Sequence, residues 1–329
     1  MGSFTSVEIC AGGGGQVLGL EQAGFDPVLL LDEKATCCET LSLNRPKWQV
    51  VRGDLRELTS EEHPEILDVD LLSGGVPCSP YSSAGRQEGN KDARDLLEAA
   101  IYLAYEVRPR AIMIENTADL VTKEKFASNR KNIIDHLEHL GYAFDWQVLD
   151  AQNFGVPQRR RSSVLVAMLP EQFAGFTWPD PVGPPPSVAE VLFTSMNSRG
   201  WPHAERWAAM AADVAPTIVG GSDKHGGADL GPSRSKAAWE RLGVNGTSLA
   251  EEPPGPDFGF ETDHRAGLPK LTVDQVALLQ GFPDSWRFAG KKTAKYRMVG
   301  NSFPPPVARA VGEKIASALA IPFMNSHNG

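Results

Sequence analysis

Residues 7–15 read VEICAGGGG, a short apolar run that enters a turn of four glycines. A helix is expected after the turn, through Leu18 and Leu20 toward Ala23. A strand, a glycine turn and a helix in this order let the backbone approach a bulky ligand at the helix N-terminus. The turn alone suits a dinucleotide, a flavin or S-adenosylmethionine equally, and it also fits a simple tight turn.

The alternation of strands and helices continues outward from this turn. Apolar runs predict further strands at residues 27–31, 49–51, 69–72, 111–114, 144–149 and 164–168. Helical spacing is found at residues 35–43, 95–107, 133–140, 272–280 and 307–320. Strands that alternate with helices predict the α/β fold class, with a doubly wound, mainly parallel sheet whose two faces are covered.

Carboxyl groups follow several of these strands, at the edge where such sheets bind their ligands. Asp32 ends the second strand, and its carboxylate could accept both hydroxyls of a ribose or cap the next helix. Asp54 follows the third strand and could accept an adenine amino group, or serve as a cap or turn residue. Glu115 and Asn116 follow a later strand, where a carboxyl can hydrogen-bond a heteroaromatic ring nitrogen or amino group, or cap a helix.

The loop at residues 73–82, SGGVPCSPYS, holds Cys78 just past a strand end. Glycine and proline constrain this loop, and an exposed loop can hold a thiolate for attack. The alternative is a buried cysteine that acts as a small hydrophobe. Residues 154–161, FGVPQRRR, supply guanidinium groups for a base carbonyl or a phosphate, or form a solvated basic loop. The spacing of cysteines and histidines predicts no metal site.

The regular alternation ends after Pro170, and a proline-rich linker follows at residues 179–186. We therefore expect three parts: a catalytic and cofactor domain at 1–176, a small loop-rich domain at 177–268, and a return segment at 269–329.

The chain has 329 residues, of which 41% are hydrophobic and 22% charged, as in ordinary globular proteins. Its formal net charge of −9 argues weakly against a nucleic-acid partner, although a basic patch on an acidic protein can still bind DNA. We find no secretory signal and no apolar run of membrane-spanning length, so we expect a cytoplasmic protein with reduced cysteines.

Taken together and in order, these blocks resemble the bacterial DNA (cytosine-5) methyltransferase family. The resemblance covers residues 7–168 and 268–312, and it implies a Rossmann-like methyltransferase domain, a target-recognition domain at 177–268 and a last helix that packs back onto the cofactor site. It rests on six motifs: AGGGG at 11–15, GGVPC at 74–78, ENT at 115–117, FGVPQRRR at 154–161, LLQGFP at 278–283 and GNS at 300–302.

The resemblance implies an enzyme that transfers a methyl group from S-adenosylmethionine to C5 of cytosine in DNA, with S-adenosylhomocysteine as product. Cys78 would form a covalent adduct with C6 of a flipped-out cytosine, Glu115 would contact N3 and the amino group, and Arg160 would hold the base or anchor the site. The cofactor site implied comprises Cys10, Ala11, Gly12, Gly13, Gly15, Asp32, Glu33, Asp54, Leu55, Pro77, Asn301 and Ser302.

The partner implied is double-stranded DNA, bound at a specific sequence. Thr217-Ile218 resembles a dipeptide of the target-recognition domain, and residues 220–227, GGSDKHGG, could form a loop that enters a groove. The residues predicted to contact DNA are Ser82, Arg159, Arg161, Thr217, Lys224 and Arg234. One recognition domain and no internal repeat suggest a monomer on DNA, with no metal and no membrane contact, and a companion restriction endonuclease fits such an enzyme.

Five positions depart from the family pattern: Cys10 replaces an aromatic residue, Val76 a proline, Ser79 a glutamine, Thr117 a valine and Ser162 an arginine. Ser162 leaves the role of the neighbouring Arg161 open. The alternatives are a tRNA cytosine-5 methyltransferase, whose Cys-Phe-Thr signature this sequence lacks, a Rossmann oxidoreductase, and a catalytically silent DNA-binding relative.

Overall fold

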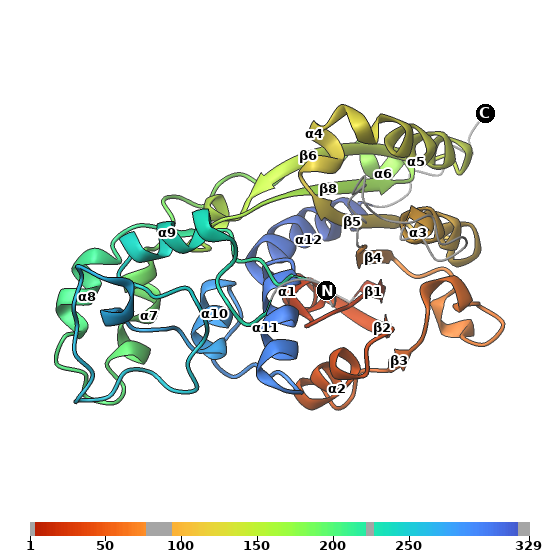
Figure 1. Ribbon diagram of the computed structural model, residues 1–329. Coiled ribbons are helices and arrows are strands. Elements are labelled where there is room, and N and C mark those ends of the chain that lie inside the picture. Colours follow the sequence, from red (N-terminus) through yellow and green to blue (C-terminus); the bar gives the residue numbers. More distant parts are fainter. Residues whose placement is uncertain (1–3, 77–93, 222–226, 322–329) are drawn as a thin grey trace, which may run out of the picture.

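A seven-stranded sheet forms the centre of the larger lobe, at the right of Figure 1, in a computed structural model that describes residues 4–76, 94–221 and 227–321. The strand order is β3-β2-β1-β4-β5-β8-β6. The strands are β1 (Phe4–Ile9), β2 (Phe25–Asp32), β3 (Val50–Arg52), β4 (Leu71–Gly75), β5 (Ala111–Thr117), β6 (Ala143–Asp150) and β8 (Arg161–Met168). β8 is antiparallel to β5 and β6, and the other paired strands are parallel, which confirms the α/β class and the mainly parallel sheet.

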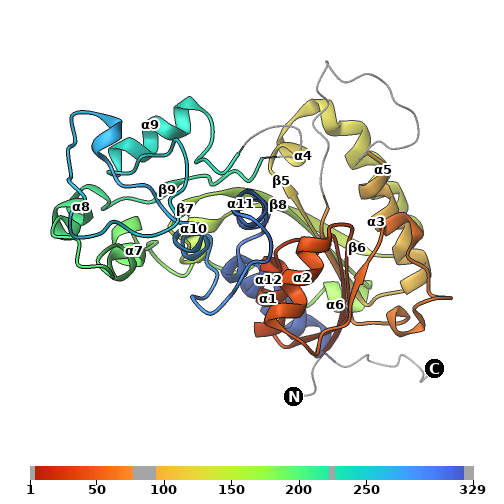
Figure 2. The ribbon, with the colours of Figure 1, turned by 60° about the horizontal axis from the view of Figure 1, so that its bottom comes forward.

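Helices cover both faces of the sheet (Figures 1 and 2). On one face, α12 (Pro305–Leu319) packs against α1 (Gly15–Gln22) and the strands. On the other face, α3 (Arg94–Val107) and α5 (Ala127–His139) close a second hydrophobic core. Strands that are buried on both faces need continuous apolar runs, and such runs are what made the central strands recognisable in the sequence.

The contact between α1 and α12 is close, because a Cβ at Gly19 would lie 2.3 Å from Pro305 O. α2 (Ala35–Asn44) shares a hydrophobic cluster with α1. The shorter helices of this lobe are α4 (Asp119–Thr122), α6 (Pro170–Phe173), η1 (Leu55–Glu57), η2 (Pro64–Ile66), η3 (Glu124–Phe126) and η4 (Ala151–Phe154). None of the helices in the described ranges has the length and hydropathy that a membrane span requires.

The smaller lobe, at the left of Figure 1, is more helical than its sequence suggested. Its elements are α7 (Val188–Met196), α8 (Ala204–Met210), β9 (Ala215–Pro216), α9 (Ser233–Arg241) and η5 (Arg265–Gly267). Trp201, Trp207 and Trp239 are buried at its centre. Each helix is at most nine residues long, too short for the apolar period to repeat, and the tryptophans that form the core lie in or beside separate helices.

The return segment connects the two lobes (Figure 2). It comprises α10 (Val273–Leu279), α11 (Lys292–Asn301) and α12. α11 was not among the helices expected from the sequence, which showed here only the GNS motif at 300–302. One hydrophobic cluster runs from the small lobe through α10 and α11 to α1 and α2, so the three-part division at 176 and 268 stays a prediction. A short parallel pair, β7 (Gln158–Arg159) with β9, also joins the lobes.

Candidate active site

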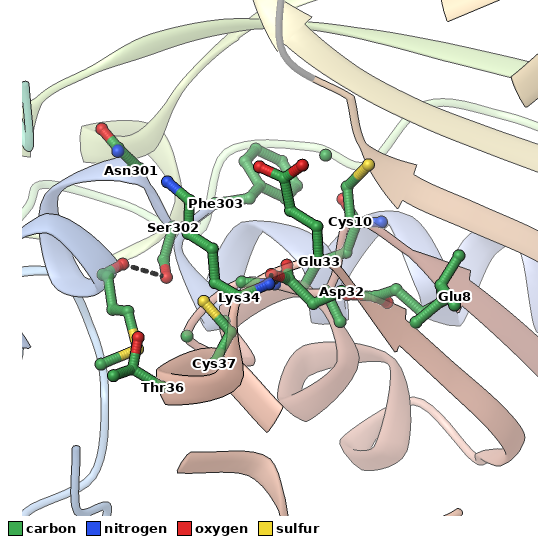
Figure 3. Close-up of a pocket in the computed structure, with 18 of the residues that line it drawn as sticks. Glu8, Cys10, Asp32, Glu33, Lys34, Thr36, Cys37, Asn301, Ser302 and Phe303 are labelled. Atoms are coloured by element: carbon green, nitrogen blue, oxygen red, sulfur yellow. Dashed lines mark hydrogen bonds between the residues drawn. The ribbon is translucent and has the colours of Figure 1, made fainter. Parts of the chain in front are cut away.

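A cavity of about 280 Å³ opens at the carboxyl ends of β1, β2, β4 and β5 (Figure 3). The glycine turn, the end of β2, the segment after β3 and the C-terminal end of α11 line it. Every described residue of the predicted cofactor set lies in this lining, and so does Glu115. Pro77, the remaining member, lies outside the described residues. Residues from across the whole chain thus meet at one edge of the sheet, where α/β folds bind their ligands.

The glycines of the turn serve two different purposes. A Cβ at Gly12 would find only Cys10 O within 4 Å, at 3.9 Å, so the Gly12 backbone faces open space in the cavity. A Cβ at Gly15 would instead lie 2.3 Å from Phe303 O, and one at Gly14 would lie 2.7 Å from the Trp286 ring. Trp286 Nε1 also donates a hydrogen bond to the carbonyl oxygen of Gly13, at 3.0 Å. Gly12 therefore leaves room for a ligand, while the later glycines let the return segment pack against the turn.

Glu8 holds the first turn of α1 next to the glycine turn through a hydrogen bond. The sequence did not predict this role. Its buried carboxyl accepts hydrogen bonds from Val17 N and Ser73 Oγ, both at 3.1 Å. Val17 is in the first turn of α1, whose N-cap residue Gly14 has no side chain to cap it. Burial raises the pKa of Glu8 to about 8. The only sequence signal was a carboxylate inside an otherwise apolar strand.

The two acidic residues at the end of β2 point to different tasks. Asp32 Oδ2 accepts a hydrogen bond from Gly12 N at 2.8 Å, and Asp32 Oδ1 accepts one from Lys34 N at 2.9 Å. Both oxygens of Asp32 are therefore engaged by the backbone. Glu33 is exposed and extends from the end of β2 into the cavity (Figure 3). The ribose contact that the sequence suggested for Asp32 fits Glu33 better.

Asp54, which follows β3, also lines the cavity. Its carboxylate pairs with Arg56 and accepts a hydrogen bond from Arg56 N at 3.0 Å, so the pKa of Asp54 is lowered to about 2. It is thus an ionised acceptor at neutral pH. Ser302 Oγ, by contrast, donates to Met298 O at 2.6 Å (Figure 3), and Asn301 Nδ2 donates to Gly221 O at 3.2 Å. These two side chains are held by the protein although both residues line the cavity.

Buried Glu115 lines the cavity, and half-buried Arg160 lies close enough for its charge to act on the Glu115 carboxyl. Burial raises the pKa of Glu115, and the charge of Arg160 partly opposes that rise. Burial likewise lowers the pKa of Arg160, against the charge of Glu115. The next residue, Asn116, donates through Nδ2 to Val76 O at 2.8 Å, which fixes the start of the segment that carries Cys78. Cys78 itself lies outside the described residues.

Residues 4–317 match the family described as C-5 cytosine-specific DNA methylase. The chain belongs to this family. It is therefore a DNA cytosine-5 methyltransferase. It is similar to the type II methyltransferase M.NaeI of Lentzea aerocolonigenes, with 48% identity over 97% of this chain and 76% of that protein. It is also similar to the type II methyltransferase M.NgoMIV of Neisseria gonorrhoeae, with 43% identity over 96% of this chain and 98% of that protein.

Solved structures agree at the level of the fold. The structure of DNMT2 from Spodoptera frugiperda has a TM-score of 0.68 at 16% identity and covers 95% of this chain and 100% of that one. S. pombe Dnmt2 has a TM-score of 0.63 at 18% identity and covers 96% of this chain and 98% of that one. At such low identity these similarities show a shared methyltransferase architecture.

This cytosine methylase has a thiol where the family pattern has an aromatic residue. Cys10 is half-buried and adopts a φ of 52°, in the left-handed region that few residues other than glycine occupy. Burial, together with the nearby carboxylates of Asp32 and Glu33, raises the pKa of Cys10 to about 12. Cys10 is therefore a neutral thiol at physiological pH and is poorly suited to act as a nucleophile.

The residues predicted to contact DNA differ in their exposure and in their bonds to the rest of the methylase. Arg159 pairs with Asp213 at 2.8 Å, and Thr217 Oγ1 donates to Arg159 O at 2.5 Å. Arg161 is exposed at the start of β8, and Arg234 is exposed on α9 of the small lobe. Ser82 and Lys224 lie outside the described residues.

Proposed function

We propose that this methylase transfers the methyl group of S-adenosylmethionine to C5 of a flipped-out cytosine in a specific DNA sequence, through a covalent bond between Cys78 and C6. The proposal rests on one observation. The open Gly12 backbone, the Glu33 carboxylate and buried Glu115 all line the same cavity. A flipped base is required because C5 is inaccessible in a stacked duplex. We further propose that the enzyme acts in the cytoplasm as a monomer on DNA.

The cavity has groups suited to S-adenosylmethionine, which supplies an electrophilic methyl group when bound. Glu33 would accept the ribose hydroxyls, and ionised Asp54 would accept the adenine amino group. The Gly12 backbone leaves room for the ligand at the start of α1. We include Pro77 in this site on the strength of its motif alone.

Burial raises the pKa of Glu115, which favours the protonated form of its carboxyl. Protonated Glu115 would donate to cytosine N3 and accept from the amino group. The Cys78 thiolate would add to C6, and the electron pair of the C5–C6 double bond would become nucleophilic at C5 as N3 takes the proton. After C5 gains the methyl group, loss of its proton and of the thiolate would restore the double bond and free the enzyme.

We assign Arg160 chiefly an anchoring role. Its Nη1 donates to Ile218 O at 3.2 Å and to Gly300 O at 3.0 Å, which ties the arginine motif to the small lobe and to α11. Its charge also faces Glu115. The exposed Arg161 and Arg234 are our candidates for phosphate or base contacts, with Thr217 and the residues outside the described ranges, Ser82 and Lys224.

The two relatives reported above are named type II methyltransferases. We propose that this chain likewise belongs to a type II restriction–modification system and protects the target site of a companion endonuclease. Methylation of one short motif would agree with this role.

Incubation with radiolabelled S-adenosylmethionine and unmethylated genomic DNA, followed by bisulfite sequencing, tests the proposal. We expect label in DNA and protected cytosines in one short motif, and we expect the Cys78→Ser variant to give neither. A parallel incubation with total RNA tests the tRNA alternative. Label in RNA alone would replace the DNA assignment, and no label in either nucleic acid would indicate a silent binding protein.

A further inference from the structure

Side chains of the arginine motif hold the segment Thr217–Gly221 of the small lobe through both backbone polar groups of one residue, Ile218. Ile218 N donates to Gln158 Oε1 at 2.8 Å, and Ile218 O accepts from Arg160 Nη1 at 3.2 Å. Gln158 and Arg160 are two residues apart, at and just after β7. Because Ile218 is hydrogen-bonded through both its N–H and its C=O, a displacement of this residue would break both bonds.

The same two side chains are also linked to the C-terminal end of α11 and, through Gln280, to Ser302, which follows it. Arg160 Nη1 also donates to Gly300 O at 3.0 Å. Gln158 Nε2 donates to Gln280 Oε1 at 2.7 Å, and Gln280 Nε2 donates to Ser302 O at 2.5 Å. The result is a one-way chain of hydrogen bonds from Ile218 through two fully buried amides to Ser302. Because each amide uses its oxygen on one side and its nitrogen on the other, the chain fixes both orientations.

The backbone of Thr217–Gly221 also packs directly against the C-terminal end of α11. A Cβ at Gly300 would lie 2.4 Å from Gly220 N, and one at Gly220 would lie 2.5 Å from Asn301 Oδ1. Tyr296 OH donates to Val219 O at 3.1 Å, and Asn301 Nδ2 donates to Gly221 O. Val219, Gly220 and Gly221 are therefore packed closely against the C-terminal end of α11.

The far side of this contact is the cavity itself, since Asn301 and Ser302 both line it (Figure 3). We propose that Gln158 and Gln280 are positioning residues that couple cofactor binding to DNA binding, by linking the cavity wall to Thr217–Gly221. This inference rests on the proposed function. A ligand in the cavity restricts the motion of the end of α11. The chain of amides passes this restraint to Thr217–Gly221 in the small lobe, so DNA binds a segment that is already held in position.

The test measures the affinity of the full chain for a duplex that carries the motif mapped by bisulfite sequencing, with and without saturating S-adenosylhomocysteine. For the wild type we expect the cofactor product to tighten DNA binding about 5- to 150-fold. The double variant Gln158→Met/Gln280→Met should retain no more than about a 2-fold effect, because methionine is similar in size to glutamine but cannot link Ile218 to Ser302 by hydrogen bonds. Its affinity for S-adenosylhomocysteine alone should stay within about 2-fold of the wild type, which a merely structural loss would not permit.

Two further variants keep the test decisive if the double variant folds poorly. Tyr296→Phe removes one bond to Val219 and should reduce the coupling partially. Gln172→Met changes a buried amide of α6, outside the contact, and should leave the coupling intact. Full coupling in both the double variant and Tyr296→Phe, or its absence in the wild type, would overturn the inference and leave the methyltransferase function standing. A wild type that binds no S-adenosylhomocysteine would instead overturn the proposed function, and the inference with it.

Discussion

At the residue scale, we propose that the neighbouring acids Asp32 and Glu33 have separate roles, one in stability and the other in ligand binding. The Asp32 carboxylate holds two backbone N–H groups, whereas Glu33 extends into the cavity. Residue order at the end of a strand cannot reveal this division, because it depends on which side chain the glycine turn engages. The sequence therefore predicted the strand end as a ribose site, and the structure was needed to favour one acid over the other.

We expect Glu33→Gln to weaken S-adenosylhomocysteine binding by about 10-fold or more, because it removes a charged acceptor, with little effect on stability. Asp32→Asn should instead lower the free energy of unfolding by about 1–3 kcal/mol, since one backbone N–H would face an amide N–H₂. Titration calorimetry and urea unfolding of both variants measure these effects. Equal loss of binding in the two variants, with equal stability, would contradict the assignment.

Glu8 gives the molecule a pH dependence with a definite sign. Its pKa rises from 4.5 when exposed to about 8 in the fold, so between these values the native state binds a proton that the unfolded state has released. Its contribution to stability is therefore complete below pH 4.5 and is lost as the pH rises toward 8. The slope from this one group is about 1.4 kcal/mol per pH unit.

Glu8→Gln should remove that slope, so its free energy of unfolding should fall less steeply than the wild type's between pH 5 and 8, a window within the pKa shift just given. Urea unfolding at several pH values measures the difference. The exposed Glu61→Gln serves as the control and should follow the wild type. A Glu8→Gln variant whose stability runs parallel to the wild type throughout this window would disprove the account of Glu8.

At the element scale, the sequence predicted most strands and helices of the larger lobe. Runs such as PVLLL and AIMI are long enough and apolar enough to identify buried strands. The helices of the small lobe were not predicted, because short helices show too few apolar repeats. α11 was not predicted because it has lysines along its first turn. Its burial against other elements, not its own pattern, makes α11 a helix.

The α1–α12 contact illustrates what tertiary packing demands of one residue. Gly19→Ala would place a Cβ 2.3 Å from Pro305 O, so we expect the free energy of unfolding to fall by about 1–3 kcal/mol. Gly259→Ala is the matched control, because a Cβ there would meet no atom within 4 Å. Urea unfolding of both variants is the measurement. Equal stability of the two would contradict the close packing of these helices.

At the scale of the whole molecule, the cofactor cavity is assembled from segments at both ends of the sequence. The motif order predicted which residues would meet, and the cavity lining contains every described member of the predicted cofactor set. The order of the motifs could not predict the hydrogen bonds that link the two lobes. The bond between the buried amides of Gln158 and Gln280 joins residues that are 122 positions apart. Contacts of this kind depend on long-range packing and leave no local pattern.

The central claim is that Cys78 bonds covalently to the target cytosine, and a duplex with fluorine at C5 of that cytosine tests it most directly. Fluorine cannot leave as a proton, so the enzyme should stay bonded to DNA after methyl transfer. With S-adenosylmethionine present, we expect a denaturation-resistant complex whose DNA is attached to the peptide containing Cys78, as read by mass spectrometry, and no complex from Cys78→Ser. Methylation of ordinary cytosine without any such complex, or a complex formed at another residue, would contradict the account.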